Sequence, residues 1–332
     1  MDPITQGTLG ALAPQFLIKA RSLLAVGVIG FLAGLAPDLD VLIRSDINPL
    51  LSLEFHRHFT HSIFFVPFGA SICATIFYVI TRYFLNISFG VIWLACFIGY
   101  GTHGLLDSCT SYGTLLFWPL SNERVAWNIL SIIDPLFTLP LLLFVILAAI
   151  TQARKFAIFG VIWMIGYLSI AYFQQQRAVS FAEKLAVSRN HDFLRVEAKP
   201  SFGNVVLWKT IYETEESFHV DAVRPLLNVH HFKGESVKKL DIARDFPWLL
   251  PDSQQYKDVQ KFAWFSNNYL AVMSSDSDGI GDIRYSMLPH KVEPLWLIKL
   301  DSEASSSQHV TYEMNRSAVS PRLNKLVSMI FD

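Results

Sequence analysis

Three polar clusters interrupt an otherwise apolar stretch of the chain: Pro37-Asp38-Leu39-Asp40, His56-Arg57-His58-Phe59-Thr60-His61-Ser62 and His103-Gly104-Leu105-Leu106-Asp107. Two strongly apolar runs separate the second cluster from the third. Ionisable side chains are costly next to lipid, and where they occur there they are usually functional. If the topology of the chain brings the three clusters to one membrane face, they form a site.

The composition of the whole chain is that of a membrane protein. Of its 332 residues, 52% are hydrophobic and 17% are charged, which is too apolar for an ordinary soluble protein. The net charge of -1 gives no bulk basicity, so we expect no nucleic-acid partner. The first residues lack a basic segment followed by an apolar core and a small-residue cleavage site, so we expect no removable signal peptide.

Apolar runs of crossing length predict a polytopic α-helical membrane domain with five or six transmembrane helices. A bilayer crossing needs about twenty predominantly apolar residues. Five runs have about this length, and a sixth, residues 4–18, is marginal. The five are residues 22–43, 61–81, 87–107, 132–150 and 156–173.

Alternation of these crossings brings the three clusters to the same side of the membrane. If the turn at Lys19 and Arg21 lies on one side, all three clusters fall on the opposite side, together with Asp134. The turns on the first side carry basic residues and no acid, so the positive-inside rule predicts that this side is cytoplasmic. The clusters are then expected on the extracytoplasmic side.

A change of composition predicts a second, soluble domain. We place the membrane domain at residues 1–175 and a β-rich (α+β) C-terminal domain at residues 176–332. The Ser, Asp and Gly cluster at residues 274–281 predicts a surface turn. Because the last crossing ends on the side of the clusters, this domain is expected on that side. Alternation typical of half-buried strands occurs at residues 193–196, 205–212, 217–222 and 294–300.

The clusters contain the residue types of a metal site. His103 and Asp107 are four residues apart, which places them on one face of a helix. Asp38 and Asp40 follow Pro37, where a kink can turn both carboxylates inward. The predicted metal ligands are Asp38, Asp40, His61, His103 and Asp107.

A mixed set of imidazoles and carboxylates favours zinc, with manganese or iron as alternatives, over magnesium or calcium. A catalytic metal of this kind lowers the pKa of a bound water and polarises a carbonyl or phosphoryl oxygen. We therefore predict a metal-dependent hydrolase that cleaves an ester or phosphoester. A lipid or another amphiphilic small molecule is the expected substrate, because the site lies at the membrane.

Three further residues are predicted to act in catalysis. Arg57 would hold an anionic group of the substrate, and His56 or a carboxylate would take the proton from the attacking water. Asp134 is the third, but it precedes Pro135, a pattern equally typical of a helix N-cap, and both interpretations are open.

A non-enzymatic membrane protein that binds a protein partner is the alternative. In that protein the polar cluster would be a structural metal site or a hydrogen-bonded latch. An open coordination position facing a cavity would favour the enzyme, and a closed, fully ligated site would favour the latch.

Further motifs accompany the three clusters: Met1-Asp2-Pro3-Ile4-Thr5-Gln6, Thr110-Ser111-Tyr112-Gly113, Phe117-Trp118-Pro119-Leu120 and Ser131-Ile132-Ile133-Asp134-Pro135-Leu136-Phe137-Thr138. In combination with the clusters they resemble the YdjM-type family, whose members are described as membrane-bound, metal-dependent hydrolases and as LexA-binding, inner-membrane-associated proteins. The resemblance covers roughly the first 175 residues and implies a multi-pass protein of the bacterial inner membrane. It also implies metal ligands among Asp38, Asp40, His56, His61, His103 and Asp107. The chain departs from the family in carrying Thr5-Gln6 where many relatives carry Thr-His, which removes one potential ligand.

Overall fold

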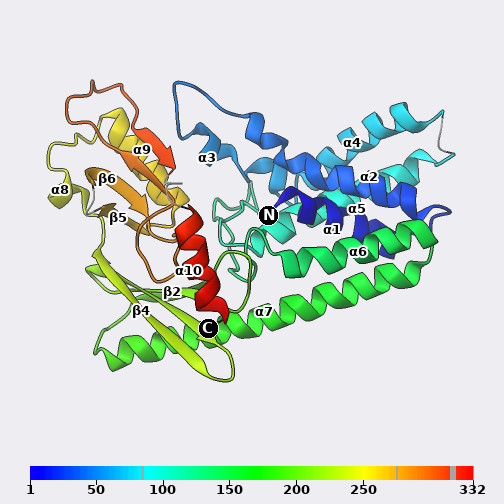
Figure 1. Cartoon of the computed structure of the whole chain (residues 1–332). Coiled ribbons are helices and arrows are strands. Elements are labelled where there is room, and N and C mark those ends of the chain that lie inside the picture. Colours follow the sequence, from blue (N-terminus) through cyan, green and yellow to red (C-terminus); the bar gives the residue numbers. More distant parts are fainter. Residues whose placement is uncertain (84–85, 274–275, 315–318, 332) are drawn as a thin grey trace. The chain divides into compact units, whose positions relative to one another are not determined.

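The computed structural model describes residues 1–83, 86–273, 276–314 and 319–331. The chain separates into two compact units (Figure 1). The first comprises Met1–Leu42, Phe55–Tyr172 and Phe202–Asn204, and the second comprises Ile43–Glu54, Phe173–Ser201 and Val205–Asp332.

Up to residue 188 the named elements of the described chain are helices, and residues 109–134 between two of them form a loop with an isolated bridge between Thr114 and Val125. In order the helices are α1 (Pro3–Leu17), α2 (Leu23–Leu35), the 3-10 helix η1 (Ala36–Leu42), α3 (Leu51–Phe55), the 3-10 helix η2 (Phe59–His61), α4 (Val66–Thr81), α5 (Phe89–Ser108), α6 (Pro135–Thr151) and α7 (Arg154–Ser188). Side-chain caps fix the start of several of them. Asp2 accepts a hydrogen bond from the main-chain nitrogen of Thr5 at 3.0 Å, and Ser22 accepts one from Ala25 at 3.2 Å.

Three of the described helices are long and apolar enough to cross a membrane: Leu23–Leu42, which joins α2 to η1, then α5 and α7. A fourth is counted if Leu51–His61 and Val66–Thr81, which meet at 84°, form one broken span. The prediction of apolar helices in the N-terminal half is confirmed, and three to four of the five or six predicted spans meet this criterion.

The predicted crossing at residues 61–81 is a continuous helix only from Val66 onward. Helix η2 ends at His61 and α4 begins only at Val66. Pro67 lies in the first turn of α4, where a residue without a main-chain N–H is tolerated because that group would have no helical partner. His61 is thus the last residue of η2 and lies at the corner between η2 and α4.

Very close helix packing brings α1, α2 and α5 together. A Cβ atom on Gly30 would lie 2.2 Å from the main-chain oxygen of Gly10, and one on Gly99 would lie 2.5 Å from that of Gly30. Small residues allow such an approach between helices in an apolar environment. The result is that η1, which follows α2, lies against α5, the helix that carries His103 and Asp107.

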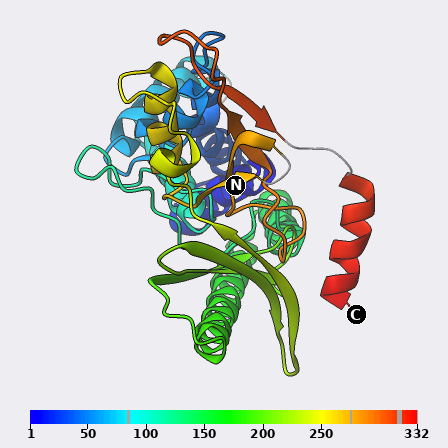
Figure 2. The ribbon, with the colours of Figure 1, turned by 90° about the vertical axis from the view of Figure 1, so that its left-hand side faces the viewer.

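The second unit contains two four-stranded antiparallel sheets with strand orders β1-β2-β3-β4 and β5-β6-β7-β8 (Figure 2). The strands are β1 (Arg195–Pro200), β2 (Trp208–Glu213), β3 (Ser217–Pro225), β4 (Val229–Lys238), β5 (Leu270–Met273), β6 (Asp276–Asp282), β7 (Trp296–Lys299) and β8 (Thr311–Met314). The prediction of a β-rich C-terminal part is confirmed, and the four predicted strands overlap β1, β2, β3 and β7. The unit also contains α8 (Ile242–Asp245), α9 (Gln254–Phe265) and α10 (Val319–Phe331), together with most of α3 and the part of α7 from Phe173 onward.

The predicted surface turn at residues 274–281 is wrong for its described part. Residues 276–281 belong to β6, while 274–275 lie outside the described residues. In this strand Ile280 is fully buried and pairs with Val272 on one side and Ile298 on the other. Pairing of apolar residues on both sides overrides the local turn preference of the Ser, Asp and Gly residues.

Candidate functional site

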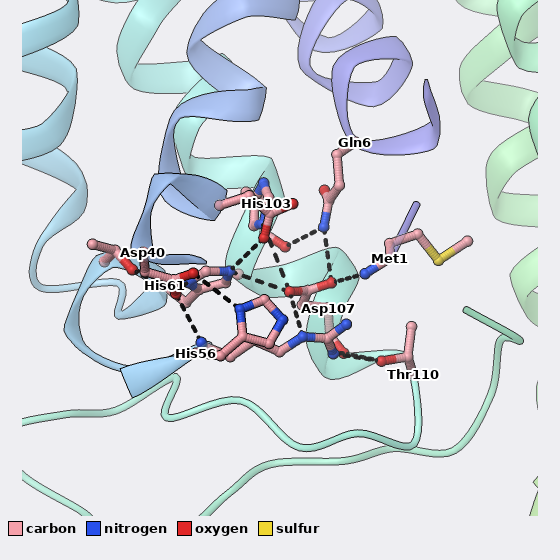
Figure 3. Close-up of polar contacts among 12 residues, drawn as sticks. Met1, Gln6, Asp40, His56, His61, His103, Asp107 and Thr110 are labelled. Carbon is pink, nitrogen blue, oxygen red and sulfur yellow. Dashed lines mark hydrogen bonds and ion pairs between the residues drawn. The ribbon is translucent and has the colours of Figure 1, made fainter. Parts of the chain in front are cut away.

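Four side chains from three separate elements converge in the first unit (Figure 3). Asp38 comes from η1, His61 from the end of η2, and both His103 and Asp107 from α5. Each offers one ligand atom, and the four atoms all lie within 4.8 Å of one another. The predicted helical spacing of His103 and Asp107 and the predicted long-range convergence are both present in the structure.

Four distances between these atoms are compatible with a tetrahedral metal site. Nε2 of His61 lies 3.4 Å from Oδ1 of Asp38 and 3.3 Å from Oδ2 of Asp107. Nε2 of His103 lies 3.3 Å and 3.6 Å from the same two oxygens. Ligands about 2.1 Å from a tetrahedral ion are about 3.4 Å from each other, whereas an N–H···O hydrogen bond is about 2.7–3.2 Å long. The spacing therefore fits coordination better than direct hydrogen bonding.

The partners of the other ring nitrogens direct both histidines into the cluster. Nδ1 of His103 lies 2.6 Å from the main-chain oxygen of Gly34. That oxygen can only accept, so Nδ1 carries the hydrogen, and in the neutral ring Nε2 keeps its lone pair. Nδ1 of His61 lies 3.3 Å from Oδ2 of Asp40, the same carboxylate-to-imidazole arrangement that orients metal-ligating histidines.

Buried atoms without partners point to the same conclusion. Among the described residues, Nε2 of His61, Nε2 of His103 and Oδ2 of Asp107 are buried and have no hydrogen-bond partner. Buried polar atoms are almost always hydrogen-bonded, and Oδ2 of Asp107 has only an ion-pair contact with Nε of Arg57, so the convergence of these three atoms needs an explanation. The residues present fit a divalent metal ion at the position between them.

Positive and polar groups surround the Asp107 carboxylate. Its Oδ1 contacts the amino group of Met1 and accepts a hydrogen bond of 2.9 Å from the Gln6 amide. Nε of Arg57 lies 3.0 Å from Oδ2. The Asp107 side chain is fully buried, and these groups offset the cost of burying its charge. Gln6 therefore supports a predicted ligand at the position where many relatives carry histidine.

Asp40, predicted as a ligand, lies behind His61. Its Oδ2 accepts hydrogen bonds from the main-chain nitrogen of Arg57 at 2.8 Å and the hydroxyl of Thr60 at 3.2 Å. Its Oδ1 lies 2.9 Å from Nδ1 of His56. Asp40 is absent from the four-residue group, but it forms a second group of potential ligands with Asp38 and His56.

His56 and Asp38 are the accessible members of the cluster. The side chain of each is 26% exposed, whereas those of His61 and His103 are fully buried. The His56 ring also meets the ring of Tyr112 edge-on, with centroids 5.4 Å apart. A small molecule that reached the cluster would therefore approach past His56 and Asp38.

The Arg57 side chain is buried and already engaged. Its Nη1 donates to the Thr110 hydroxyl at 2.8 Å, and its guanidinium lies 4.7 Å from the centre of the Tyr112 ring. Arg57 also has a positive φ of 62°, a strained conformation that aims this side chain at Asp107. The structure thus places Arg57 against a predicted metal ligand.

Asp134, the third predicted catalytic residue, caps α6. Its Oδ1 accepts a hydrogen bond of 3.2 Å from the main-chain nitrogen of Phe137, and the Tyr167 hydroxyl donates to Oδ2 at 2.8 Å. Asp134 belongs to neither group of potential ligands among the described residues. The geometry favours the N-cap interpretation over the catalytic one.

Two residues important to this geometry had no role in the sequence analysis. Gly34 contributes only its main-chain oxygen, which no side-chain pattern reveals. Gly104 lies within a quoted motif, and a Cβ atom there would lie 2.1 Å from the main-chain oxygen of His61. Only glycine permits α5 to approach the corner that carries His61 so closely.

The apolar helices and this cluster together define the chain as a membrane protein with a candidate metal site. The chain belongs to the YdjM inner membrane protein family, whose model matches residues 1–178, so the resemblance noted from the motifs is confirmed. A stretch of 100 residues is 31% identical to the uncharacterized protein YfhP of Bacillus subtilis (strain 168). That match covers 30% of this chain and 29% of YfhP. No solved structure matches the chain.

Proposed function

We propose that this chain is a multi-pass inner-membrane hydrolase that uses a divalent metal to cleave an ester or phosphoester of a lipid or another amphiphilic molecule. The observation that carries the proposal is the convergence of Asp38, His61, His103 and Asp107, whose ligand atoms lie within 4.8 Å of one another, with both Nε2 atoms directed inward. The mixed nitrogen and oxygen ligands favour zinc over manganese and iron. A metal in this position would supply a Lewis acid and lower the pKa of a bound water.

The chain's own residues would hold the metal and move the proton. Asp38, His61, His103 and Asp107 are the proposed ligands. His56 is the proposed proton acceptor, because its Nδ1 is held by Asp40 at 2.9 Å while its ring remains partly accessible. Asp40 would stabilise the protonated imidazole and keep the ring oriented, as a carboxylate does in other proton-transfer pairs.

Arg57 has a different role in this proposal from the one expected from sequence. Its guanidinium contacts Asp107, Thr110 and Tyr112, so its charge acts first on the Asp107 ligand. We assign it to positioning Asp107 and to raising the positive potential at the site, which favours an anionic substrate such as a phosphoester.

The proposed topology follows from the polar clusters. Five or six crossings would bring the cluster to one membrane face, on the extracytoplasmic side, and would place the C-terminal unit on that side as well. A site at the lipid boundary is open to molecules that are already in the membrane. A lipid or amphiphile is therefore the substrate class that fits best.

The test is metal analysis of the purified full chain in detergent, followed by a screen of carboxylic and phosphoric esters that includes phospholipids. We expect one tightly bound metal ion per chain and metal-dependent cleavage of at least one amphiphilic ester. The variant His56→Ala should keep the metal and lose at least about a hundredfold in turnover, the usual contribution of a general base. Full activity in His56→Ala would remove His56 from the mechanism.

A second candidate function, that of a partner-binding protein with a structural metal, is supported by the number of proposed metal ligands. Four protein ligands complete the coordination of a structural zinc site, which would make the cluster a latch in a partner-binding protein. In that case the metal would exchange slowly, chelation would lower the melting temperature of the full chain, and the ester screen would find no turnover. Rapid exchange of the metal together with turnover would instead favour the hydrolase.

A further inference from the structure

A pocket of about 750 Å³ lies in the second unit, where the β3–β4 hairpin meets α7. The turn between the two strands is at the lower edge of Figure 1, beside the C-terminal part of α7. The last residues of α10 also line the pocket. The residues that line it are Gln174, Arg177, Val206, Arg224, Leu226, Leu227, Asn228, Ile330 and Phe331.

Two arginines give this pocket a positive charge. Arg177 donates hydrogen bonds to the main-chain oxygen of Leu226 and, at 3.0 Å, to the side-chain oxygen of Gln174. Arg224 donates to the main-chain oxygen of Ile330 at 2.8 Å. All three acceptors are neutral, and within the described parts of the chain no carboxylate forms an ion pair with either guanidinium. The pocket therefore offers two cations to an anionic ligand.

Exposed apolar side chains form the rim of the same pocket. Leu227 is 101% exposed and Phe331 is 79% exposed, and both line the pocket directly. Leu226, beside Leu227 at the tip of the hairpin, is 39% exposed. Large apolar side chains adjacent to cations and amides match a ligand with a charged head and an apolar body.

The position of the pocket along α7 sets its depth relative to a bilayer. α7 is one unbroken helix, and its apolar part ends at Phe173. Arg177 follows four residues later, which is about 6 Å along the helix axis. The headgroup layer on each side of a bilayer is about 5–7 Å thick. If α7 crosses the membrane as proposed above, Arg177 lies within the headgroup layer.

We propose that this pocket binds the headgroup phosphate of an anionic membrane phospholipid, with Leu226, Leu227 and Phe331 reaching toward the first carbons of its acyl chains. Arg177 and Arg224 would donate hydrogen bonds to the phosphate oxygens. The site would fix the second unit to the bilayer surface. The inference rests on the proposed crossing by α7, but it requires neither the metal site nor any hydrolytic activity.

The first experiment measures lipid binding to the full chain in nonionic detergent. Phosphatidylglycerol is titrated against wild type and the double variant Arg177→Gln/Arg224→Gln, with bound lipid counted by native mass spectrometry. Each lost charge should weaken binding about fivefold, so we expect a loss of about twenty- to thirtyfold in the double variant. Phosphatidylcholine, whose choline cation offsets the phosphate charge, should bind wild type more weakly than phosphatidylglycerol does.

Lys257→Gln is the matched control, because it removes an exposed positive charge from α9 of the same unit. It should bind phosphatidylglycerol as wild type does. Equal affinity of wild type and the double variant, or an equal loss in the control, would overturn the proposal. So would displacement of the lipid by millimolar inorganic phosphate, since the pocket would then be a site for free phosphate.

The second experiment measures depth and does not depend on the arginines. A fluorophore on Leu227→Cys or on Ser305→Cys is placed in the full chain in nanodiscs that contain brominated lipid. Selective labelling is feasible because Cys73, Cys96 and Cys109 are buried. The probe at 227 should be quenched strongly and the probe in the exposed polar loop at 305 should not. Equal quenching at both positions, or none at 227, would contradict membrane contact by the hairpin.

Discussion

His103 and Gly34 are joined by a hydrogen bond of 2.6 Å from Nδ1 of the imidazole to the main-chain oxygen. Because Gly34 belongs to α2 and His103 to α5, the packing of two helices fixes the ring of a proposed metal ligand. The same contact determines which nitrogen faces Asp38 and Asp107. The geometry of the site is thus coupled to helix packing in the first unit.

Replacement of His103 by alanine should abolish metal binding while the chain still inserts into the membrane. The variant loses one of four proposed ligands and leaves a single imidazole nitrogen beside two carboxylates. Metal per chain is measured by elemental analysis of protein purified in detergent. His230→Ala, an exposed histidine on β4, is the control and should leave the metal content unchanged. Stoichiometric metal in His103→Ala would remove His103 from the ligand set.

Asp40→Asn should weaken metal binding without removing a ligand. Asp40 faces Nδ1 of His61 at 3.3 Å and Nδ1 of His56 at 2.9 Å, and loss of such an orienting carboxylate typically lowers metal affinity about 10- to 100-fold. The measurement is competition with a chelator of known affinity. Complete loss of metal in Asp40→Asn would show instead that Asp40 is itself a ligand, as the sequence suggested.

Gly104→Ala should disrupt the site through main-chain packing alone. The added Cβ would lie 2.1 Å from the main-chain oxygen of His61, and overpacking of this kind costs roughly 1–3 kcal/mol or more. We expect a lower melting temperature and weaker metal binding. Gly166→Ala is the matched control, since a Cβ there meets no atom within 4 Å. If both variants behave alike, close approach at Gly104 is not required.

Asp134 can be tested with two substitutions that separate capping from catalysis. Asparagine caps helices about as well as aspartate, whereas alanine loses about 1 kcal/mol. If Asp134 only caps α6, Asp134→Asn should keep both stability and turnover, and Asp134→Ala should melt earlier with its metal content intact. A stable but inactive Asp134→Asn would restore the catalytic interpretation.

Lys209 should make the second unit more stable as the pH rises above 7. Burial lowers the pKa of Lys209 to about 7, whereas a lysine in the unfolded chain titrates near 10.4. Between these values the unfolded state binds more protons, so the free energy of unfolding rises with pH, by up to about 1.4 kcal/mol for each pH unit. This stability is complete above the unfolded pKa and is lost as the pH falls toward 7.

Lys209→Met should flatten that pH dependence. Denaturation of the full chain in detergent at pH 7.0 and 8.5, followed by a fluorophore on Ser305→Cys, reports on the second unit. Lys257→Met removes an exposed lysine and should keep the wild-type pH dependence. An unchanged pH dependence in Lys209→Met would assign the titration to another group.

The sequence predicted the members of the site better than their separate roles. The pairing of His103 and Asp107 could be predicted because helical periodicity alone places them on one face. The sequence did not reveal that Asp38 and Asp40 point in different directions, because it gave no sign that both lie in a 3-10 helix. Residues two apart in such a helix point about 240° apart, which directs Asp38 toward His103 and Asp40 toward His56.

One strand that escaped prediction, β4, has a clear physical reason. β4 (Val229–Lys238) lies at the edge of its sheet, and its residues are exposed or only partly buried along the whole strand. Without one buried face there is no alternation of apolar and polar residues to detect. Its register comes from pairing with β3, a long-range property that a local pattern does not contain.

The uninterrupted course of α7 restricts how this chain can change in length. The helix has 35 residues, about 52 Å at 1.5 Å per residue, and a bilayer core takes up about 30 Å. Each inserted or deleted residue would turn everything beyond it by about 100° about the helix axis. Where homologues differ in the length of this helix, we expect the difference to be close to a whole number of turns, such as about seven residues, and single-residue gaps to occur only beyond its ends.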